Sequence, residues 1–84
     1  MKHRASKRFW ATYDKLPASV QKLGDTNFQL LKRNPHHPSL QFKRVKEYWS
    51  VRVGLHYRAL AVEYDGEIVW YWIGPHAQYD RLIR

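Results

Sequence analysis

The spacing of apolar side chains changes once along the chain, at Pro35-His-His-Pro38, and this change constrains the fold more than any other feature. Before it, apolar residues recur at the period of about 3.6 that is typical of a helix, and after it the period falls toward the two-residue repeat of a strand. The 84 residues are enough for one small domain, 1–84, with a single modest core.

The N-terminal part predicts two helices. The first covers residues 4–16 and gathers its apolar side chains on one side, at Phe9, Trp10, Tyr13 and Leu16. The second has Pro17 in its first turn, where a missing N–H costs little, and it ends at Asn34-Pro35. Together the two segments predict a helical hairpin over about 4–33.

The rest of the chain predicts four strands, near 40–46, 48–54, 57–64 and 67–73. Asp65-Gly66 is a strong two-residue hairpin signal, and the other connections are also short, so the strands should be antiparallel neighbours. The third strand is apolar at both its odd and its even positions, so both of its faces should be covered, which indicates a central position in the sheet. The predicted fold is therefore α+β, with the helical hairpin on one face of a four-stranded antiparallel sheet and the other face free to form a site.

Composition narrows the class of protein. The chain has no cysteine, so disulfides and thiolate metal sites are excluded, and four tryptophans and six tyrosines argue against disorder. No apolar run is long enough to span a membrane, so we expect a soluble cytoplasmic protein.

The net charge of +8 is concentrated in one half of the sequence. Residues 1–46 hold eleven Lys and Arg against two acids, whereas residues 47–84 hold four against five. Such a basic half can meet phosphates, an acidic protein or an anionic membrane surface, or it can simply be a solvated surface. The strength of the asymmetry favours nucleic acid.

Two arginines stand inside otherwise apolar strand patterns. Arg52 and Arg58 are costly to bury unless each has a partner or faces a water-filled cleft. One interpretation of Arg58 is a structural ion pair with Glu63 or Glu47. The other is a guanidinium aimed at a phosphate, whose oxygens match its planar fork.

Basic and aromatic residues on the outer strands leave alternatives open. Lys43, Arg44 and Lys46 are either a solvated edge that blocks aggregation or a rail for phosphates that binds RNA. Trp70 and Trp72 on the last strand fit ordinary packing, although one aromatic ring on an open face could stack on a base.

The five histidines do not show the spacing of a metal site, so we expect neither metal nor another cofactor. His76 is the informative one, because it closely follows the end of the last strand, where site residues concentrate. Imidazole groups can exchange protons near neutral pH, which suits acid–base catalysis.

Four ordered fragments make the chain resemble the RelE/ParE superfamily of toxins from bacterial toxin–antitoxin systems. They are Asn34-Pro-x-x-Pro-Ser-Leu40, Tyr48-Trp-Ser-x-Arg52, Tyr57-Arg-Ala-Leu60 and Ile73-Gly-x-His76-x-x-Tyr79. The likeness covers roughly residues 17–84. The Tyr-Trp-Ser-x-Arg element and the terminal His and Tyr are similar to the mRNA-cleaving HigB- and YoeB-like members.

The resemblance implies a compact nuclease that cleaves mRNA on the ribosome without metal, through the 2′-OH, and that is neutralised by a cognate acidic antitoxin in a hetero-oligomer. It places Arg58 at the arginine that acts on the scissile phosphate and Arg52 at a basic position on the preceding strand. It places His76 and Tyr79 in the region that supplies acid–base or stacking groups.

Two departures from the family pattern stand out. Many members begin with a strand before the helices, for which this chain has room for only a few residues. Some carry a glutamate base before the Tyr-Trp-Ser element, where this chain has Ser39. Three functions stay open: a ribosome-dependent mRNA endonuclease, a ParE-like inhibitor of DNA gyrase without nuclease activity, and a basic RNA-binding module.

Overall fold

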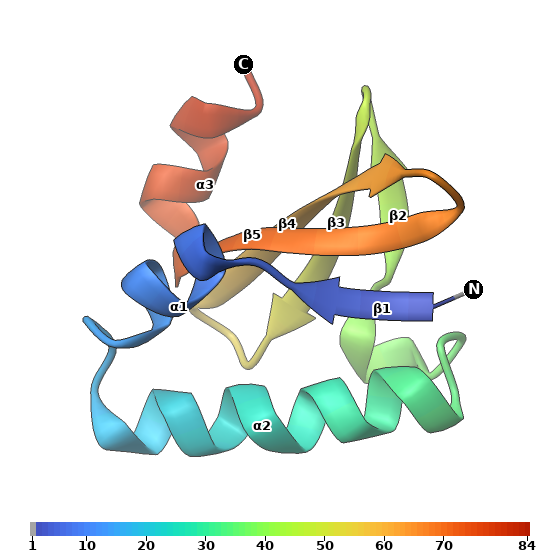
Figure 1. Cartoon of the computed structure of the whole chain (residues 1–84). Helices are drawn as coiled ribbons and strands as arrows, with labels where there is room; N and C mark the ends of the chain where they lie inside the picture. Colours follow the sequence, from blue (N-terminus) through green and yellow to red (C-terminus); the bar gives the residue numbers. More distant parts are fainter. Residues whose placement is uncertain (1) are drawn as a thin grey trace.

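A computed structural model describes residues 2–84, and in this part of the chain three α-helices surround one five-stranded sheet. The strands are β1 (Lys2–Ala5), β2 (Lys43–Val45), β3 (Tyr48–Val53), β4 (Tyr57–Tyr64) and β5 (Glu67–Pro75). The helices are α1 (Lys7–Tyr13), α2 (Ala18–Arg33) and α3 (His76–Leu82), with a 3₁₀ turn, η1, at Pro38–Leu40. Helices α1 and α2 lie on one face of the sheet and α3 lies on the other (Figure 1). The predicted α+β class is confirmed.

The sheet has the strand order β1-β5-β4-β3-β2, so β4 is central, as its apolar sequence predicted. Strands β2 to β5 pair antiparallel, and β1 pairs parallel with β5 at the edge. Asp65 and Gly66 form the predicted hairpin turn, both with positive φ, at 50° and 78°. Such a pair of left-handed residues matches the twist of the two strands it joins. The sheet therefore has five strands within residues 2–84, where the sequence predicted four.

The prediction of one helix over 4–16 is wrong at its beginning, because β1 comes first. Side chains in β1 alternate between exposed and half-buried, and His3 is one that faces the interior. Ser6 then starts α1: its Oγ accepts a hydrogen bond from the backbone N–H of Phe9 at 3.3 Å and donates to the carbonyl of Trp70 at 3.1 Å. A serine just before an apolar run is a helix-start signal, so the true boundary was present in the sequence.

The C-terminal part also differs from expectation. The strand predicted over 40–46 is only the short β2, because η1 and Gln41, at a left-handed φ of 44°, occupy its beginning. The strand predicted over 67–73 continues to Pro75, and a helix, α3, follows it directly. None of the helices within residues 2–84 is long and apolar enough to cross a membrane.

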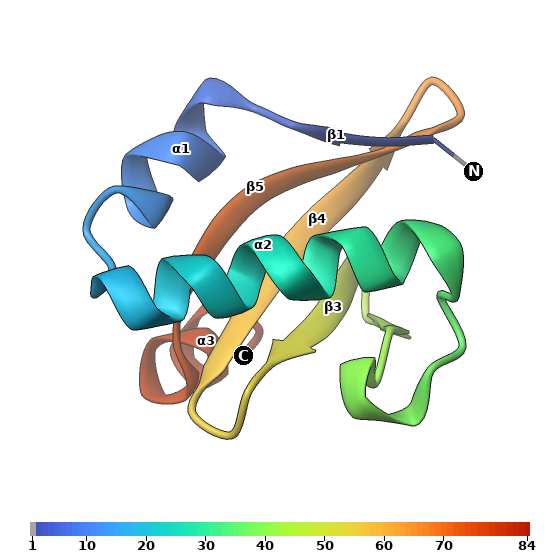
Figure 2. The ribbon, with the colours of Figure 1, turned by 90° about the horizontal axis from the view of Figure 1, so that it is seen from below.

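The core lies between the sheet and the pair α1 and α2, and α2 crosses beneath β3 and β4 (Figure 2). Every second residue of β3 and β4 points into it, so the intervening residues face the opposite side. The buried core residues are Leu31, Leu40, Val51, Val53, Ala59, Ala61, Ile68, Trp70 and Ile73.

Replacing either of two glycines with alanine should change the free energy of unfolding, in opposite directions at the two positions. Gly24 is inside α2, and a Cβ there would lie an ordinary 3.5 Å from Cδ1 of Ile73. Gly24→Ala should therefore raise the free energy of unfolding by about 0.5–1 kcal/mol through helix propensity. Gly54 has φ +66°, and a Cβ there would lie 2.6 Å from Cδ2 of Leu23. Gly54→Ala should therefore lower the free energy of unfolding by about 1 kcal/mol or more. Urea denaturation of both variants checks this, and equal effects would contradict it.

His3 ties β1 to the core through an aromatic cluster. Its Nδ1 accepts a hydrogen bond from Nε1 of Trp70 at 3.1 Å, and the two rings stack with their centroids 6.1 Å apart. The ring centroids of Phe28 and Phe42 lie 6.4 and 5.9 Å from the centroid of the same imidazole. Burial lowers the pKa of His3 below its ordinary value, and the positive charge of Lys32 lowers it further.

Acid should weaken the fold through His3. The folded protein holds this imidazole neutral, whereas the unfolded chain takes up a proton near pH 6.5. The stability that His3 contributes is thus complete above about pH 6.5 and is lost as the pH falls toward the lowered pKa of the folded state. The wild type should lose more stability between pH 7.5 and 5 than His3→Gln, in which the other histidines are unchanged. Parallel pH profiles for the two proteins would refute this role.

Candidate functional site

Arg52 and Arg58 stand directly opposite each other on β3 and β4. Their chain neighbours Val51, Val53 and Ala59 are core residues, so the two arginines occupy the face of the sheet opposite α1 and α2. Both are half-buried. The structure therefore brings the two predicted arginines together on one surface, which we call the outer face.

Neither arginine of the pair forms an ion pair with a carboxylate in the described part of the chain. Within residues 2–84 the ion pairs are Arg4–Glu67, Arg44–Glu63 and His76–Asp80, so the proposed pairing of Arg58 with a glutamate does not form. Instead, Nη1 of Arg58 donates to its neighbouring backbone carbonyl, that of residue 57, at 3.0 Å.

Burial lowers the pKa of Arg58, and the charge of Arg52 across the strands lowers it further. A guanidinium remains protonated nonetheless, so the site keeps two like charges in proximity. Their mutual repulsion would be relieved by an anion bound between them. This arrangement can hold a phosphate group.

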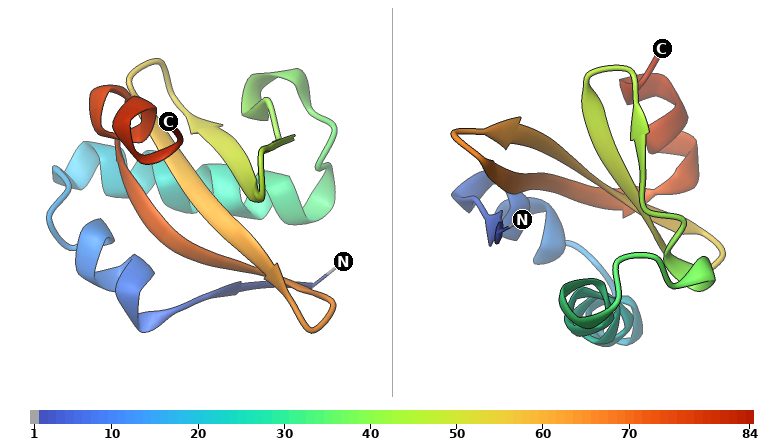
Figure 3. Two further views of the ribbon diagram at one scale, coloured as in Figure 1. Left: turned by 90° about the horizontal axis from the view of Figure 1, so that it is seen from above. Right: turned by 90° about the vertical axis from the view of Figure 1, so that its right-hand side faces the viewer.

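Helix α3 brings the other two predicted site residues to the same end of the sheet, where β5 finishes and β4 begins (Figure 3). Tyr79 is buried, and its ring centroid lies 6.0 Å from Cζ of Arg58. Ser50, only 2% exposed, donates from Oγ to the hydroxyl of Tyr79 at 3.1 Å. The backbone N–H of His76 donates to the carbonyl of His56 at 2.8 Å, which fixes the start of the helix.

Asp80 is a site residue that the sequence reasoning missed. Its Oδ2 lies 3.1 Å from Nδ1 of His76, one helical turn away. A carboxylate in that position orients the imidazole and leaves Nε2 for another partner. The i, i+4 spacing was visible in the sequence, but it becomes informative only once residues 76–82 are known to be helical.

Trp72 and Gly74 also belong to the outer face. Gly74 stands opposite Arg58 on β5, and a Cβ there would lie 2.5 Å from Cζ2 of Trp72. The glycine therefore leaves room for the Trp72 ring beside its backbone. Trp70, by contrast, is 2% exposed in the core, so the two tryptophans have different roles.

The basic residues of the β2 region separate in space. Lys43 is paired with Ser50 and shares the outer face. Arg44 turns to the other face, where its Cζ lies 5.5 Å from the Trp49 ring centroid. Lys46 is in the turn between β2 and β3, at the end of β3 away from Arg52. Only Lys43 extends the arginine surface along the sheet.

Two pockets, of about 450 and 410 Å³, lie on the helix side of the sheet and include neither arginine among their lining residues. The water-filled cleft that the sequence analysis considered for Arg52 and Arg58 thus stays a prediction. What the structure gives is a half-buried arginine couple without an ion pair among residues 2–84, with an imidazole and a carboxylate nearby.

These features define a small α+β protein with an anion-attracting face next to its C-terminal helix. The chain belongs to the ParE-like toxin domain family, whose family model matches residues 19–81. No curated protein matches the sequence at a significant level.

Solved structures of toxins share this fold. A chain of the RelB-RelE antitoxin-toxin complex from Methanococcus jannaschii aligns with a TM-score of 0.71 and 15% identity, over 95% of this chain and 98% of that one. The YoeB/ParE toxin from Agrobacterium tumefaciens aligns with a TM-score of 0.67 and 19% identity, over 90% of this chain and 99% of that one. The isolated RelE toxin of Escherichia coli aligns with a TM-score of 0.62 and 10% identity, over 96% of this chain and 94% of that one. The predicted RelE/ParE fold is therefore confirmed.

Proposed function

We propose that the protein is an mRNA endonuclease that acts on the ribosome in the cytoplasm, as the toxin of a toxin–antitoxin pair. The observation that carries this proposal is the Arg52–Arg58 couple, which forms no ion pair within residues 2–84 and lies beside the Tyr79 ring. Family membership and the RelE-like fold support the toxin assignment.

RNA cleavage through the 2′-OH needs three groups: a base for that hydroxyl, positive charge for the phosphorane and an acid for the leaving 5′-oxygen. Arg58 and Arg52 supply the positive charge in this proposal. His76 transfers a proton through Nε2, because Nδ1 is held by Asp80. In this step Nε2 of His76 accepts the proton of the 2′-OH and the 2′-oxygen attacks phosphorus. The P–O5′ bond then breaks and the leaving 5′-oxygen takes a proton from water, which leaves a 2′,3′-cyclic phosphate and a 5′-hydroxyl end.

Tyr79 has a defined place in this scheme. Its hydroxyl accepts a hydrogen bond from Ser50, so its own proton is free to point elsewhere, and its ring borders Arg58. Lys43 continues the positive surface along the outer face, where the neighbouring phosphates of a single strand could lie.

The partner in this proposal is an acidic antitoxin. Its carboxylates would pair with the arginine couple and block the phosphate site, and the net charge of +8 would accelerate association at low salt. The likeness to chains of RelB-RelE complexes supports a toxin–antitoxin hetero-oligomer.

A ParE-like inhibitor of DNA gyrase is the second candidate, favoured by the name of the matching family. Induction of the protein in bacteria distinguishes the two. We expect translation to stop and mRNA to be cut, and sequencing of 5′ ends should locate the cuts. These cuts should appear only in mRNA that ribosomes are translating. A DNA damage response with intact mRNA would overturn the nuclease and favour the inhibitor.

A further inference from the structure

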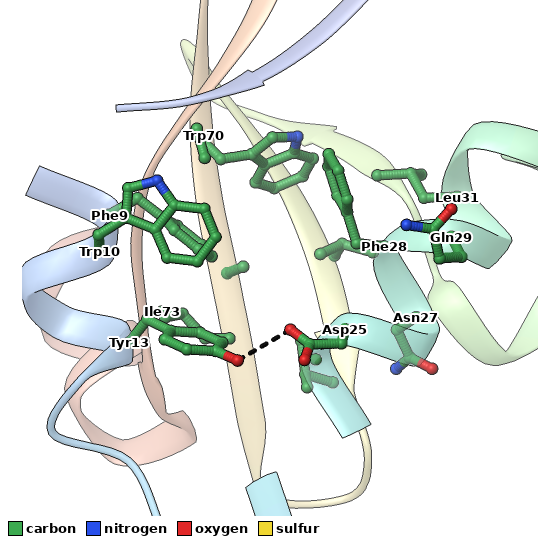
Figure 4. A pocket seen from close by; sticks show the side chains of 15 residues that line it. Phe9, Trp10, Tyr13, Asp25, Asn27, Phe28, Gln29, Leu31, Trp70 and Ile73 are labelled. Carbon is green, nitrogen blue, oxygen red and sulfur yellow. Dashed lines mark hydrogen bonds between the residues drawn. The ribbon is translucent and has the colours of Figure 1, made fainter. Parts of the chain in front are cut away.

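A pocket of about 450 Å³ opens between α1, α2 and the sheet (Figure 4). The arginine couple lies on the opposite face of the sheet. Helix α1 provides one aromatic wall with Phe9, Trp10 and Tyr13, and α2 provides Phe28 on the other side. The floor comes from the sheet and includes the buried Trp70. The space falls within the range of small-molecule sites, roughly 300–1,000 Å³, which are predominantly apolar and aromatic.

Hydrogen bonds hold the C-terminal end of α1 against α2 beside the pocket. The hydroxyl of Tyr13 donates to Oδ1 of Asp25 at 2.9 Å, and Nε2 of Gln21 donates to the carbonyl of Tyr13 at 3.0 Å. Gly24 removes a side chain where α2 passes Ile73. Trp10, at the rim, is 48% exposed, so the hollow is open to solvent and its aromatic walls lack contacts that a ligand could make.

The charge at this pocket is opposite to that of the protein. Among the described residues that line it, Asp25 alone is charged, although the chain as a whole carries +8. Burial raises the pKa of Tyr13, and Asp25 raises it further, so this hydroxyl remains a donor to the carboxylate. A carboxylate next to several aromatic faces attracts a cation, by Coulomb attraction and by the negative faces of the rings.

We propose that this pocket binds a small organic cation, namely a flat aromatic ring with a short arm that ends in a primary ammonium group. The ring lies among Trp10, Phe28 and Trp70, and the ammonium group pairs with Asp25. The inference is independent of the proposed nuclease function, because none of the pocket residues belongs to the outer face.

Three probes with one ring test the charge preference: tryptamine as the cation, indole as the neutral molecule and indole-3-acetate as the anion. The four tryptophans report location through their indole N–H signals in ¹H–¹⁵N NMR spectra. Tryptamine should shift the signals of Trp10 and Trp70, with a dissociation constant of roughly 0.1 mM for a ligand of this size. Trp49 and Trp72, which do not line the pocket, should stay in place.

Matched variants isolate the carboxylate. Indole should bind about 3–10-fold more weakly than tryptamine, the range for an exposed charge-assisted contact, and indole-3-acetate more weakly still. Asp25→Asn should remove the advantage of tryptamine while the amide oxygen still accepts from Tyr13, and Asp14→Asn, outside the pocket, should retain it.

Four results would overturn the inference. They are no binding of tryptamine, equal binding of the three probes, shifts confined to Trp49 or Trp72, and an Asp14→Asn effect as large as that of Asp25→Asn. Shifts of Trp10 and Trp70 that depend on protein concentration without any probe would show that a second copy of the chain occupies the pocket instead.

Discussion

Arg58→Ala should reduce mRNA cleavage by about 10²–10³-fold, the usual effect of removing one group that stabilises charge in the transition state. The fold should hardly change, because this side chain has no ion pair among residues 2–84 and its removal ends the repulsion with Arg52. The free energy of unfolding should therefore stay within about 1 kcal/mol of wild type. Single-turnover cleavage on programmed ribosomes and urea denaturation measure the two effects separately.

Arg44→Ala is the matched control, since it removes the same charge from the other face of the sheet, beside Trp49. It should leave cleavage within a few-fold of wild type. Arg58→Lys should recover only part of the activity, because an ammonium group lacks the planar fork that grips two phosphate oxygens. If Arg44→Ala slows cleavage as much as Arg58→Ala, the overall charge matters and the arginine couple is not a phosphate site.

Local signals in the sequence predicted much of this fold. Pro17 marked the beginning of α2, and Asp65-Gly66 marked the hairpin between β4 and β5, because each imposes a backbone conformation on its immediate neighbours. The sequence placed Arg52 and Arg58 on neighbouring strands but did not predict that they stand directly opposite each other, which the structure shows. A short turn between two strands fixes their register, so residues equally far from the turn come face to face.

The elements that were missed depend on contacts between distant parts of the chain. Strand β1 pairs with β5, more than sixty residues away, and its four residues carry too short a pattern to be told from the start of a helix. Helix α3 is a single short element whose inner residue, Tyr79, is held by a hydrogen bond from Ser50 on β3. The link between His76 and Asp80 was missed as well, because their spacing brings them together only when residues 76–82 form a helix.

His76→Ala should slow cleavage by roughly 10²–10⁴-fold, the scale of a general acid or base, and should act on kcat more than on KM. Folding should be preserved, because alanine keeps the backbone N–H that donates to the carbonyl of His56. Asp80→Asn tests the orienting carboxylate and should lower kcat by about 10-fold, with KM nearly unchanged. Rates from single-turnover cleavage at saturating and limiting ribosome concentrations separate the two constants.

The double variant decides whether Asp80 acts through His76. If the carboxylate only orients this imidazole, Asp80→Asn should have no further effect in the His76→Ala background, since coupled residues are not additive. His56→Ala is the control, because it removes a neighbouring exposed imidazole and should leave cleavage intact. A His76→Ala protein that cuts mRNA like wild type would exclude His76 as the proton-transfer group. In that case, slow cleavage by His56→Ala would transfer the role to His56. Normal cleavage by His56→Ala would leave Lys43 as the base to test, because Lys46 lies at the other end of β3.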